Sequence, residues 1–270
     1  MTGNTTRRRL LAALLSSTLS AGMAGVACAA GQQAVPVVEV SGTLPDRDEK
    51  PYRDLLAGIK MYQQQRSLAP GSTLRFKVQP RRDGVAMQSL VLQIAGAHTT
   101  IAVPLAPDHS FVLPVDAGAA RDNAMVRFNL PAGSLAWRAE IRSPGVPVYA
   151  RRLGDLMLEC KVAVAGDLLA YIHHPINMMV LKLPDPCRTL PVNLFSFADR
   201  PLFSATLVAG NRRSVMPAAM LHGPAFVPMA SQEDWLFLRD RAYTVKYKAL
   251  YDQQWPDDTL LEFSYMDDEL

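Results

Sequence analysis

Short runs of alternating apolar and polar residues dominate the chain between residues 74 and 141. The first run is Leu74–Gln79, in which every apolar residue is followed by a polar one. Successive side chains of a strand point to opposite faces, so this alternation predicts half-buried antiparallel strands. Further apolar rows start at Leu90, Ile101, Phe111, Val126 and Leu135. Turn-forming residues separate the rows at intervals of roughly 8 to 12 residues, which is typical of a β-sandwich.

One segment near the expected mature N-terminus has a different period. Apolar residues recur there at intervals of three and four, and they are Tyr52, Leu55, Leu56, Ile59 and Tyr62. This spacing places them on one face of a helix, and Pro70 with Gly71 ends the run. The sequence therefore predicts one amphipathic helix near residues 51–66, within an N-terminal β-sandwich that spans residues 30–147.

A second β-rich region follows Ser143–Pro147, which contains two prolines and a glycine and is the best linker candidate. We expect a C-terminal sandwich-like domain over residues 148–270, although the boundary could also lie near residue 167. Leu156–Val164 shows an alternating apolar row and is interpreted as a strand. Further strands are expected at 176–183, 192–197, 202–208, 243–249 and 260–265. The predicted fold class is thus mainly β, with two antiparallel sandwich-like units.

The first 29 residues have the features of a secretory signal peptide. Three arginines at Arg7–Arg9 precede an uncharged apolar stretch, and Ala27–Ala29 fits a small-residue cleavage site. The stretch is too short and too interrupted for a membrane-spanning helix. A second interpretation makes Cys28 the lipid-modified first residue of a lipoprotein, although Gly25 stands where that motif usually has leucine. Both interpretations predict a periplasmic or secreted protein.

Charge argues against nucleic acid or anionic lipid as a partner. The chain has 28 basic and 25 acidic residues. Three arginines and no acid lie in the leader, so cleavage leaves about 25 of each sign, without the basic excess that such partners require. The remaining arginine pairs, Arg81-Arg82, Arg151-Arg152 and Arg212-Arg213, are interpreted as solvated loop charges.

Two cysteines, Cys160 and Cys187, remain once Cys28 is removed or modified. The segment YIHHPINMM lies between them, and its histidines, His173 and His174, invite a zinc site shared with both cysteines. Pro175 favours extended geometry at His174, so adjacent histidine side chains would point apart. Export also places the chain in an oxidising compartment. We therefore predict a disulfide between Cys160 and Cys187, and no metal or other cofactor.

No catalytic motif for nucleophilic, zinc-hydrolytic or nucleotide chemistry is present in the sequence. A catalytic site assembled in space from distant residues stays open, so an envelope hydrolase is one alternative. Its histidine could be His98, His109, His173, His174 or His222. A periplasmic copper-binding protein is the other alternative, because thioether and imidazole ligands suit Cu(I). Its candidate ligands are Met216, Met220, His222 and Met229.

The C-terminal region holds the ligand-binding candidates. It is interpreted as a hairpin in which strands at 243–249 and 260–265 pair and present aromatic rings. The candidate binding residues are Tyr243, Tyr247, Tyr251, Trp255, Asp257 and Asp258. Rings could stack on sugars or peptides while the carboxylates accept hydrogen bonds. The alternative is structural: the tyrosines belong to the core and Trp255 caps it, which we favour because aromatic residues are enriched in strands.

Two segments carry a family resemblance. VPLAPDHSFVLPV at 103–115 resembles the hairpin of carboxypeptidase-regulatory-like, transthyretin-like modules, and PLFSATLVAGNRR at 201–213 has a similar cadence. The resemblance implies a β-sandwich without catalytic activity and an accessory or binding role in an exported protein. The expected function is therefore a non-enzymatic envelope protein whose partner is another envelope protein or a glycan.

Overall fold

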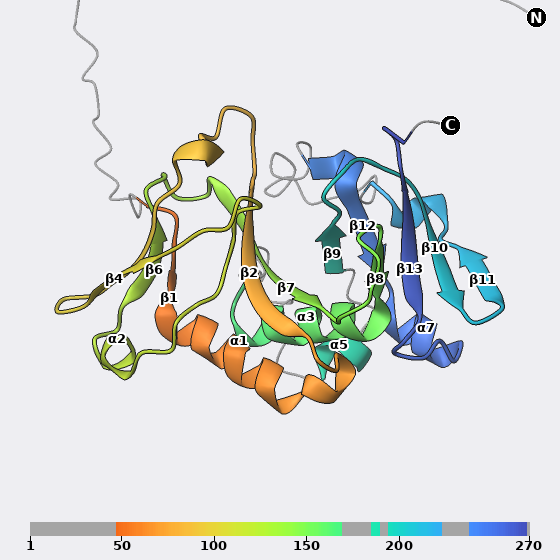
Figure 1. The fold of residues 1–270 in the computed structure, drawn as a ribbon, viewed down its shortest axis with the longest axis horizontal. Coiled ribbons are helices and arrows are strands. Elements are labelled where there is room, and N and C mark those ends of the chain that lie inside the picture. Colours follow the sequence, from red (N-terminus) through yellow and green to blue (C-terminus); the bar gives the residue numbers. More distant parts are fainter. Residues whose placement is uncertain (1–46, 169–184, 190–193, 223–237, 269–270) are drawn as a thin grey trace, which may run out of the picture. The chain divides into compact units, whose positions relative to one another are not determined.

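The structure is a computed structural model that describes residues 47–168, 185–189, 194–222 and 238–268. All of these described residues belong to one compact unit (Figure 1). The predicted leader, the segment YIHHPINMM and Met229 lie outside the described residues, as does the predicted strand at 176–183.

The described part of the chain is mainly β, and its paired strands run antiparallel, which confirms the predicted fold class. Two sheets share the first hydrophobic core. One sheet has the order β1 (Glu49–Pro51), β6 (Met125–Phe128), β3 (Leu92–Ala95), β4 (Thr100–Val103), and the other has the order β5 (Ser110–Phe111), β2 (Thr73–Pro80), β7 (Leu135–Arg142). The apolar rows read from the sequence supply this core, because each strand turns one face inward.

Two further sheets share the second hydrophobic core. A four-stranded sheet has the order β11 (Arg212–Val215), β10 (Leu202–Ala209), β13 (Leu260–Tyr265), β8 (Ala150–Arg152), and a two-stranded sheet joins β12 (Ala242–Val245) to β9 (Leu194–Phe197). The sequence placed a domain boundary at residue 147 or 167, and that division stays a prediction.

The predicted helix is present as α1 (Tyr52–Gln64), and it turns Tyr52, Leu55 and Tyr62 into the first core. Tyr52 anchors one end, because its hydroxyl donates to the carbonyl oxygen of Pro114 at 2.7 Å. Gly58 faces α3 (Leu153–Ala165) at close range: a Cβ atom there would lie 3.3 Å from Val162. The absence of a side chain thus lets the two helices approach.

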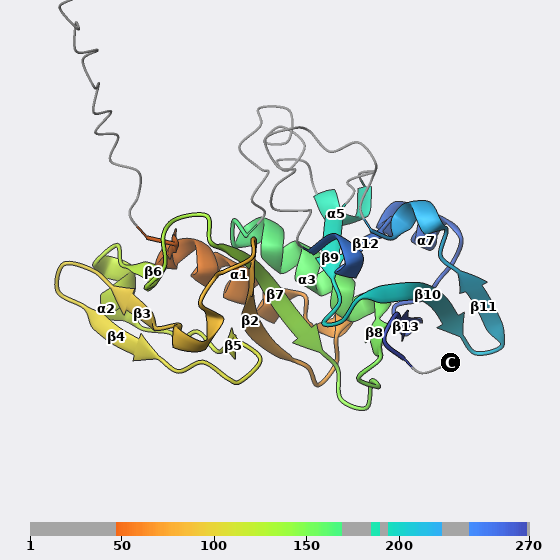
Figure 2. The ribbon, with the colours of Figure 1, turned by 90° about the horizontal axis from the view of Figure 1, so that it is seen from above.

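The strand predicted at Leu156–Val164 is wrong. These residues belong to α3 (Leu153–Ala165), a helix that contributes Leu158 and Val162 to the first core and Leu156 to the second. Apolar residues surround α3 on most sides, so its sequence matches the strand period and the helix period equally well. Figure 2 shows α3 next to β7, which it contacts, while β7 runs beside β2.

The hairpin predicted between 243–249 and 260–265 is also wrong. β12 pairs with β9, whereas β13 pairs with β10 and β8. The residues after β12 form α7 (Tyr247–Asp252), so the expected continuous strand ends at Val245. The remaining short helical elements are η1 (Arg66–Leu68), η2 (Met87–Ser89), α2 (Ala117–Arg121), α5 (Pro186–Thr189), η3 (Ala218–Met220) and η5 (Arg239–Arg241).

Cys160 of α3 and Cys187 of α5 form a disulfide, with their Cα atoms 6.0 Å apart. Both side chains are buried in the second core. The pairing agrees with the prediction from cysteine number and compartment. Among the helices of the described ranges, none combines the length and the apolar character needed to cross a bilayer.

Candidate functional site

The polar face of β7 forms the base of the candidate site. Arg138, Glu140 and Arg142 occupy alternate positions, so they share one face of the strand, while the opposite face lines the first core. Lys77 of β2 lies directly across from Arg138 in the strand register. Such a face is usually solvated, yet Lys77 and Glu140 are each only 8% exposed. The end of β9 and the turn that follows it lie against this face and supply its acceptors.

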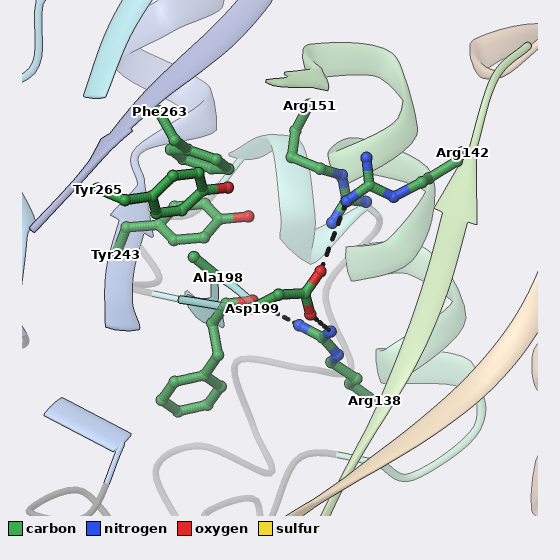
Figure 3. Close-up of a pocket in the computed structure, with 9 residues that line it drawn as sticks. Arg138, Arg142, Arg151, Ala198, Asp199, Tyr243, Phe263 and Tyr265 are labelled. Carbon is green, nitrogen blue, oxygen red and sulfur yellow. Dashed lines mark hydrogen bonds and ion pairs between the residues drawn. The ribbon is translucent and has the colours of Figure 1, made fainter. Parts of the chain in front are cut away.

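Asp199, in the turn between β9 and β10, is the acceptor on which the cations converge (Figure 3). Its Oδ1 atom accepts hydrogen bonds from Lys77 Nζ at 2.8 Å and from Arg138 Nη2 at 3.1 Å. Its Oδ2 atom lies 3.9 Å from Arg142 Nη2. The side chain of Asp199 is nevertheless 48% exposed, so three partly buried cations hold one solvent-accessible carboxylate.

The electrostatic effect on this carboxyl is large. Burial alone would raise the pKa of Asp199, but the charge of Arg138 and the hydrogen bond and charge of Lys77 outweigh burial and lower it from 3.8 to about 2. Asp199 is therefore ionised at neutral pH. The field of the surrounding cations favours an anion at this position.

The backbone of the turn is held independently of the Asp199 side chain. Arg138 Nη1 donates to the carbonyl oxygen of Phe197 at 2.5 Å, and Arg241 Nη1 donates to that of Asp199 at 3.0 Å. The amide of Ala198 donates to the carbonyl oxygen of Arg241 at 2.9 Å. These contacts hold the turn in place through main-chain atoms.

A buried ion pair borders the hollow. Arg151 of β8 is 4% exposed, and its Nη2 atom donates to Glu159 Oε1 and to the carbonyl oxygen of Ile141. Burial alone would lower the pKa of Arg151, but Glu159 raises it above its usual value. Burial also raises the pKa of the Glu159 carboxyl. Because the amide of Ile141 and Arg151 both donate to Oε1, we treat the pair as ionised. The prediction that Arg151 is a solvated loop charge is wrong.

Three aromatic rings line the other side of the hollow. They are Tyr243 of β12 and Phe263 and Tyr265 of β13 (Figure 3). The Tyr243 and Phe263 ring centroids lie 5.0 Å apart, and those of Phe263 and Tyr265 lie 6.2 Å apart. Burial raises the pKa of Tyr243 to about 12 and also raises the pKa of Tyr265. Both phenols therefore stay protonated at neutral pH and can act as hydrogen-bond donors.

The enclosed part of the hollow between these walls has a volume of about 10 Å³. While Asp199 is in place, this leaves room for about one water-sized group. Two N–H groups beside it, Nε of Arg138 and Nε of Arg151, have no hydrogen-bond acceptor among the described residues. Buried donors normally have a partner, so these two leave donor capacity for a ligand or water.

The predicted ligand-binding residues do not form one site. Tyr243 lines the hollow, but Tyr247 is buried and its hydroxyl donates to the carbonyl oxygen of Leu156 at 2.8 Å. Trp255 is 2% exposed, with the guanidinium of Arg212 stacked 3.7 Å from its ring centroid. Tyr247 and Trp255 are thus part of the second core.

The other three candidates lie near Trp255 in the chain. The hydroxyl of Tyr251 donates to Asp257 Oδ1 at 2.5 Å, and the guanidinium of Arg188 stacks on the Tyr251 ring at 4.5 Å. Asp258 is exposed. The hydroxyl of Tyr251 and the carboxylate of Asp257 are thus hydrogen-bonded to each other.

The proposed copper ligands that the structure describes are Met216, Met220 and His222. Met216 is buried and Met220 packs against the second core, as expected for gap-filling methionines. The Nε2 atom of His222 lies 2.8 Å from the carbonyl oxygen of Leu202, to which it can only donate. Within the described ranges, no group of three or more His, Cys, Asp or Glu side chains could hold a metal ion.

Of the histidines considered for catalysis, His173 and His174 lie outside the described residues, and His98, His109 and His222 do not line the hollow. His98 is exposed, and its backbone amide donates to Asp122 Oδ2 at 2.8 Å. His109 lies in the turn before β5 with a positive φ of 61°. In the part of the chain that the structure describes, no histidine ring is hydrogen-bonded to a serine hydroxyl.

Sequence reasoning missed Arg138, Arg142, Arg151 and Asp199. A signal for the first two was present: Arg138, Glu140 and Arg142 put charges at three successive positions of one strand face. Such a face is expected to be solvated, and nothing local indicates that a turn from residue 199 covers it. Comparison with protein-family models, curated proteins and solved structures finds no significant match for this chain.

Proposed function

We propose that the protein is an exported binding protein without catalytic activity, and that the hollow between β7 and the rings of β12 and β13 holds a small anionic ligand. The convergence of Lys77, Arg138 and Arg142 on one exposed carboxylate is the observation that carries the proposal. Positioned cations in a partly buried site attract an anion more strongly than the same charges in water.

The aromatic wall supports a binding role. The partly exposed ring of Tyr265 gives a small ligand apolar contact area, and protonated tyrosine hydroxyls add hydrogen-bond donors to those of the arginines. Recognition by a few convergent polar groups beside apolar surface is the usual composition of a ligand site. The described residues supply no nucleophile hydrogen-bonded to a histidine base, so binding is the chemistry that this geometry supports best.

Export is the second part of the proposal. The basic and apolar leader of residues 1–29 supports it, and so does the disulfide between Cys160 and Cys187, because disulfides persist mainly in oxidising compartments. We place the protein in the periplasm or outside the cell. The resemblance to transthyretin-like modules supports the same accessory role. Sequencing the N-terminus of protein from the native host tests export: a chain beginning near Ala30 is expected, and a chain retaining Met1 would refute it.

Thermal unfolding in a panel of small solutes tests the binding role. The panel contains acetate, inorganic phosphate, glucuronate and glucose, each compared with sodium chloride at equal ionic strength. At tenfold excess over its dissociation constant, a ligand stabilises the folded state by about 1.4 kcal/mol. At least one of the anions is expected to raise the melting temperature above that in chloride, and glucose is not.

Matched arginine variants locate the effect. Arg138→Gln is expected to abolish the stabilisation by anions, because it removes a cation from the hollow. Arg213→Gln serves as the control, since Arg213 pairs with Glu262 at 2.8 Å on the surface and its side chain is 60% exposed. Equal melting temperatures in every solute, or the same response in both variants, would overturn the assignment of the site.

A further inference from the structure

The cluster of charged side chains around Asp199 has no net charge only while the Asp199 carboxylate is part of it. Its ion pairs join three cations to three carboxylates: Lys77, Arg138 and Arg142 to Asp108, Glu140 and Asp199. Moving the Asp199 side chain away leaves an excess of one positive charge. The vacated position therefore favours an anion of a single charge, since an uncompensated cation in a partly buried site costs free energy.

Asp199 is the carboxylate of this group that can leave. Glu140 is 8% exposed and lies within 4 Å of all three cations. Asp108 is held by Ser110, whose hydroxyl and amide donate to Asp108 Oδ1 at 2.6 and 3.2 Å. The side chain of Asp199 is half exposed, and the turn that carries it is held through main-chain oxygens of Phe197 and Asp199 itself. Its side chain can therefore rotate into solvent without moving the turn.

The rest of the hollow offers donors. The guanidinium groups of Arg138, Arg142 and Arg151 line one side, and the hydroxyls of Tyr243 and Tyr265 point toward them from the other (Figure 3). Arg138 and Arg151 each retain an Nε–H without an acceptor among the residues that the structure places. In such a lining the acceptor oxygens of the Asp199 carboxylate occupy the position where an oxyanion fits.

We propose that the Asp199 carboxylate is a built-in occupant of a carboxylate site. The ligand is a small monocarboxylate whose own carboxylate displaces that of Asp199 and whose body rests on the partly exposed ring of Tyr265. This inference rests on the proposed function and deepens it by naming the ligand class. The occupant competes with the ligand. The apparent affinity for the ligand is therefore the intrinsic affinity multiplied by the fraction of time that the occupant leaves the site empty. It also keeps the cations paired when no ligand is bound.

Removing the occupant tests the inference. The probes are benzoate and its neutral isostere benzamide, titrated calorimetrically into the full mature chain at constant ionic strength. Asp199→Ala is expected to bind benzoate about tenfold more tightly than the wild type, which corresponds to a site that Asp199 fills for about nine-tenths of the time. Asp199→Asn keeps the side-chain volume and removes the charge, so it is expected to gain affinity by a smaller factor. Benzamide is expected to bind none of the three proteins.

A stability readout covers the case in which the loss of the ion pairs weakens the fold. Acetate is expected to raise the melting temperature of Asp199→Ala, relative to chloride, by more than it raises that of Asp267→Ala. Asp267 is a suitable control because it pairs with Arg200 at 2.6 Å on the surface, where its side chain is 56% exposed.

The outcomes separate the two proposals. Equal or weaker benzoate binding by both Asp199 variants, with binding by the wild type intact, overturns the built-in occupant and leaves the anion-binding function standing. Binding of benzamide as tight as that of benzoate overturns the carboxylate assignment. Failure of every anion to bind or stabilise any of the proteins overturns the proposed function together with the inference.

Discussion

Replacing both Cys160 and Cys187 with alanine removes the cross-link that joins α3 to α5. The two cysteines are 27 residues apart in the chain, and in the chain-entropy model a loop of this length stabilises the folded state by about 3.5 kcal/mol. Because both side chains are buried in the second core, the alanines also leave small cavities. The free energy of unfolding is therefore expected to fall by at least the loop contribution.

Urea unfolding followed by tryptophan fluorescence measures this loss. With a typical urea dependence of ~1–3 kcal/mol per molar, a loss of about 3.5 kcal/mol lowers the midpoint by roughly 1 to 3.5 M. Reductant is expected to lower the midpoint of the wild type by a similar amount and to leave the double variant unchanged. An equal midpoint for oxidised and reduced wild type, with complete alkylation of the reduced thiols, would refute the reasoning that the cross-link stabilises this fold.

Three further outcomes are expected. Asp48→Ala leaves the amide of Leu135 and Nε1 of Trp137 without the acceptor that they contact at 2.8 and 2.6 Å, so chemical denaturation should show a loss of about 2 to 4 kcal/mol; a loss below 0.5 kcal/mol would contradict it. Trp255→Ala should cost about 3 to 5 kcal/mol by the same assay, because the ring is buried, whereas an unchanged stability with lost ligand affinity would restore it as a surface binding residue. The folded-state pKa of Asp199, about 2, lies below its usual 3.8, so its stabilising contribution is present above about pH 4 and disappears as the pH falls toward 2. Asp199→Asn should therefore lose less stability than the wild type between pH 4 and 2, and parallel pH profiles would exclude this role for the carboxyl.

Local periodicity was sufficient for much of the N-terminal half. The alternating rows predicted β2 and β7 because each of these strands has one face in the first core, and the three- and four-residue spacing predicted α1. The disulfide followed from the number of cysteines and the expected compartment. In each of these cases the deciding information lies within a few residues or in composition.

For α3, the local sequence pattern does not distinguish a helix from a strand. Leu156 and Val162 fit an alternating row as well as a helix, since a helix that is buried on most sides carries no polar stripe to reveal its period. Packing against α1, β7 and parts of both cores selected the helix, and these contacts join segments far apart in the sequence.

Composition and local pattern thus determined the β class, the first helix and the cysteine pair, whereas the tertiary structure alone decided the candidate site. Lys77 and Asp199 are 122 residues apart, yet their charged groups lie 2.8 Å from each other. The register of β2 against β7 places Lys77 beside Arg138, and the turn after β9 then brings the carboxylate over both. Charges acquire a shared function only when the pairing of distant strands brings them within a few ångströms, because electrostatic interactions in solvent weaken over about one Debye length.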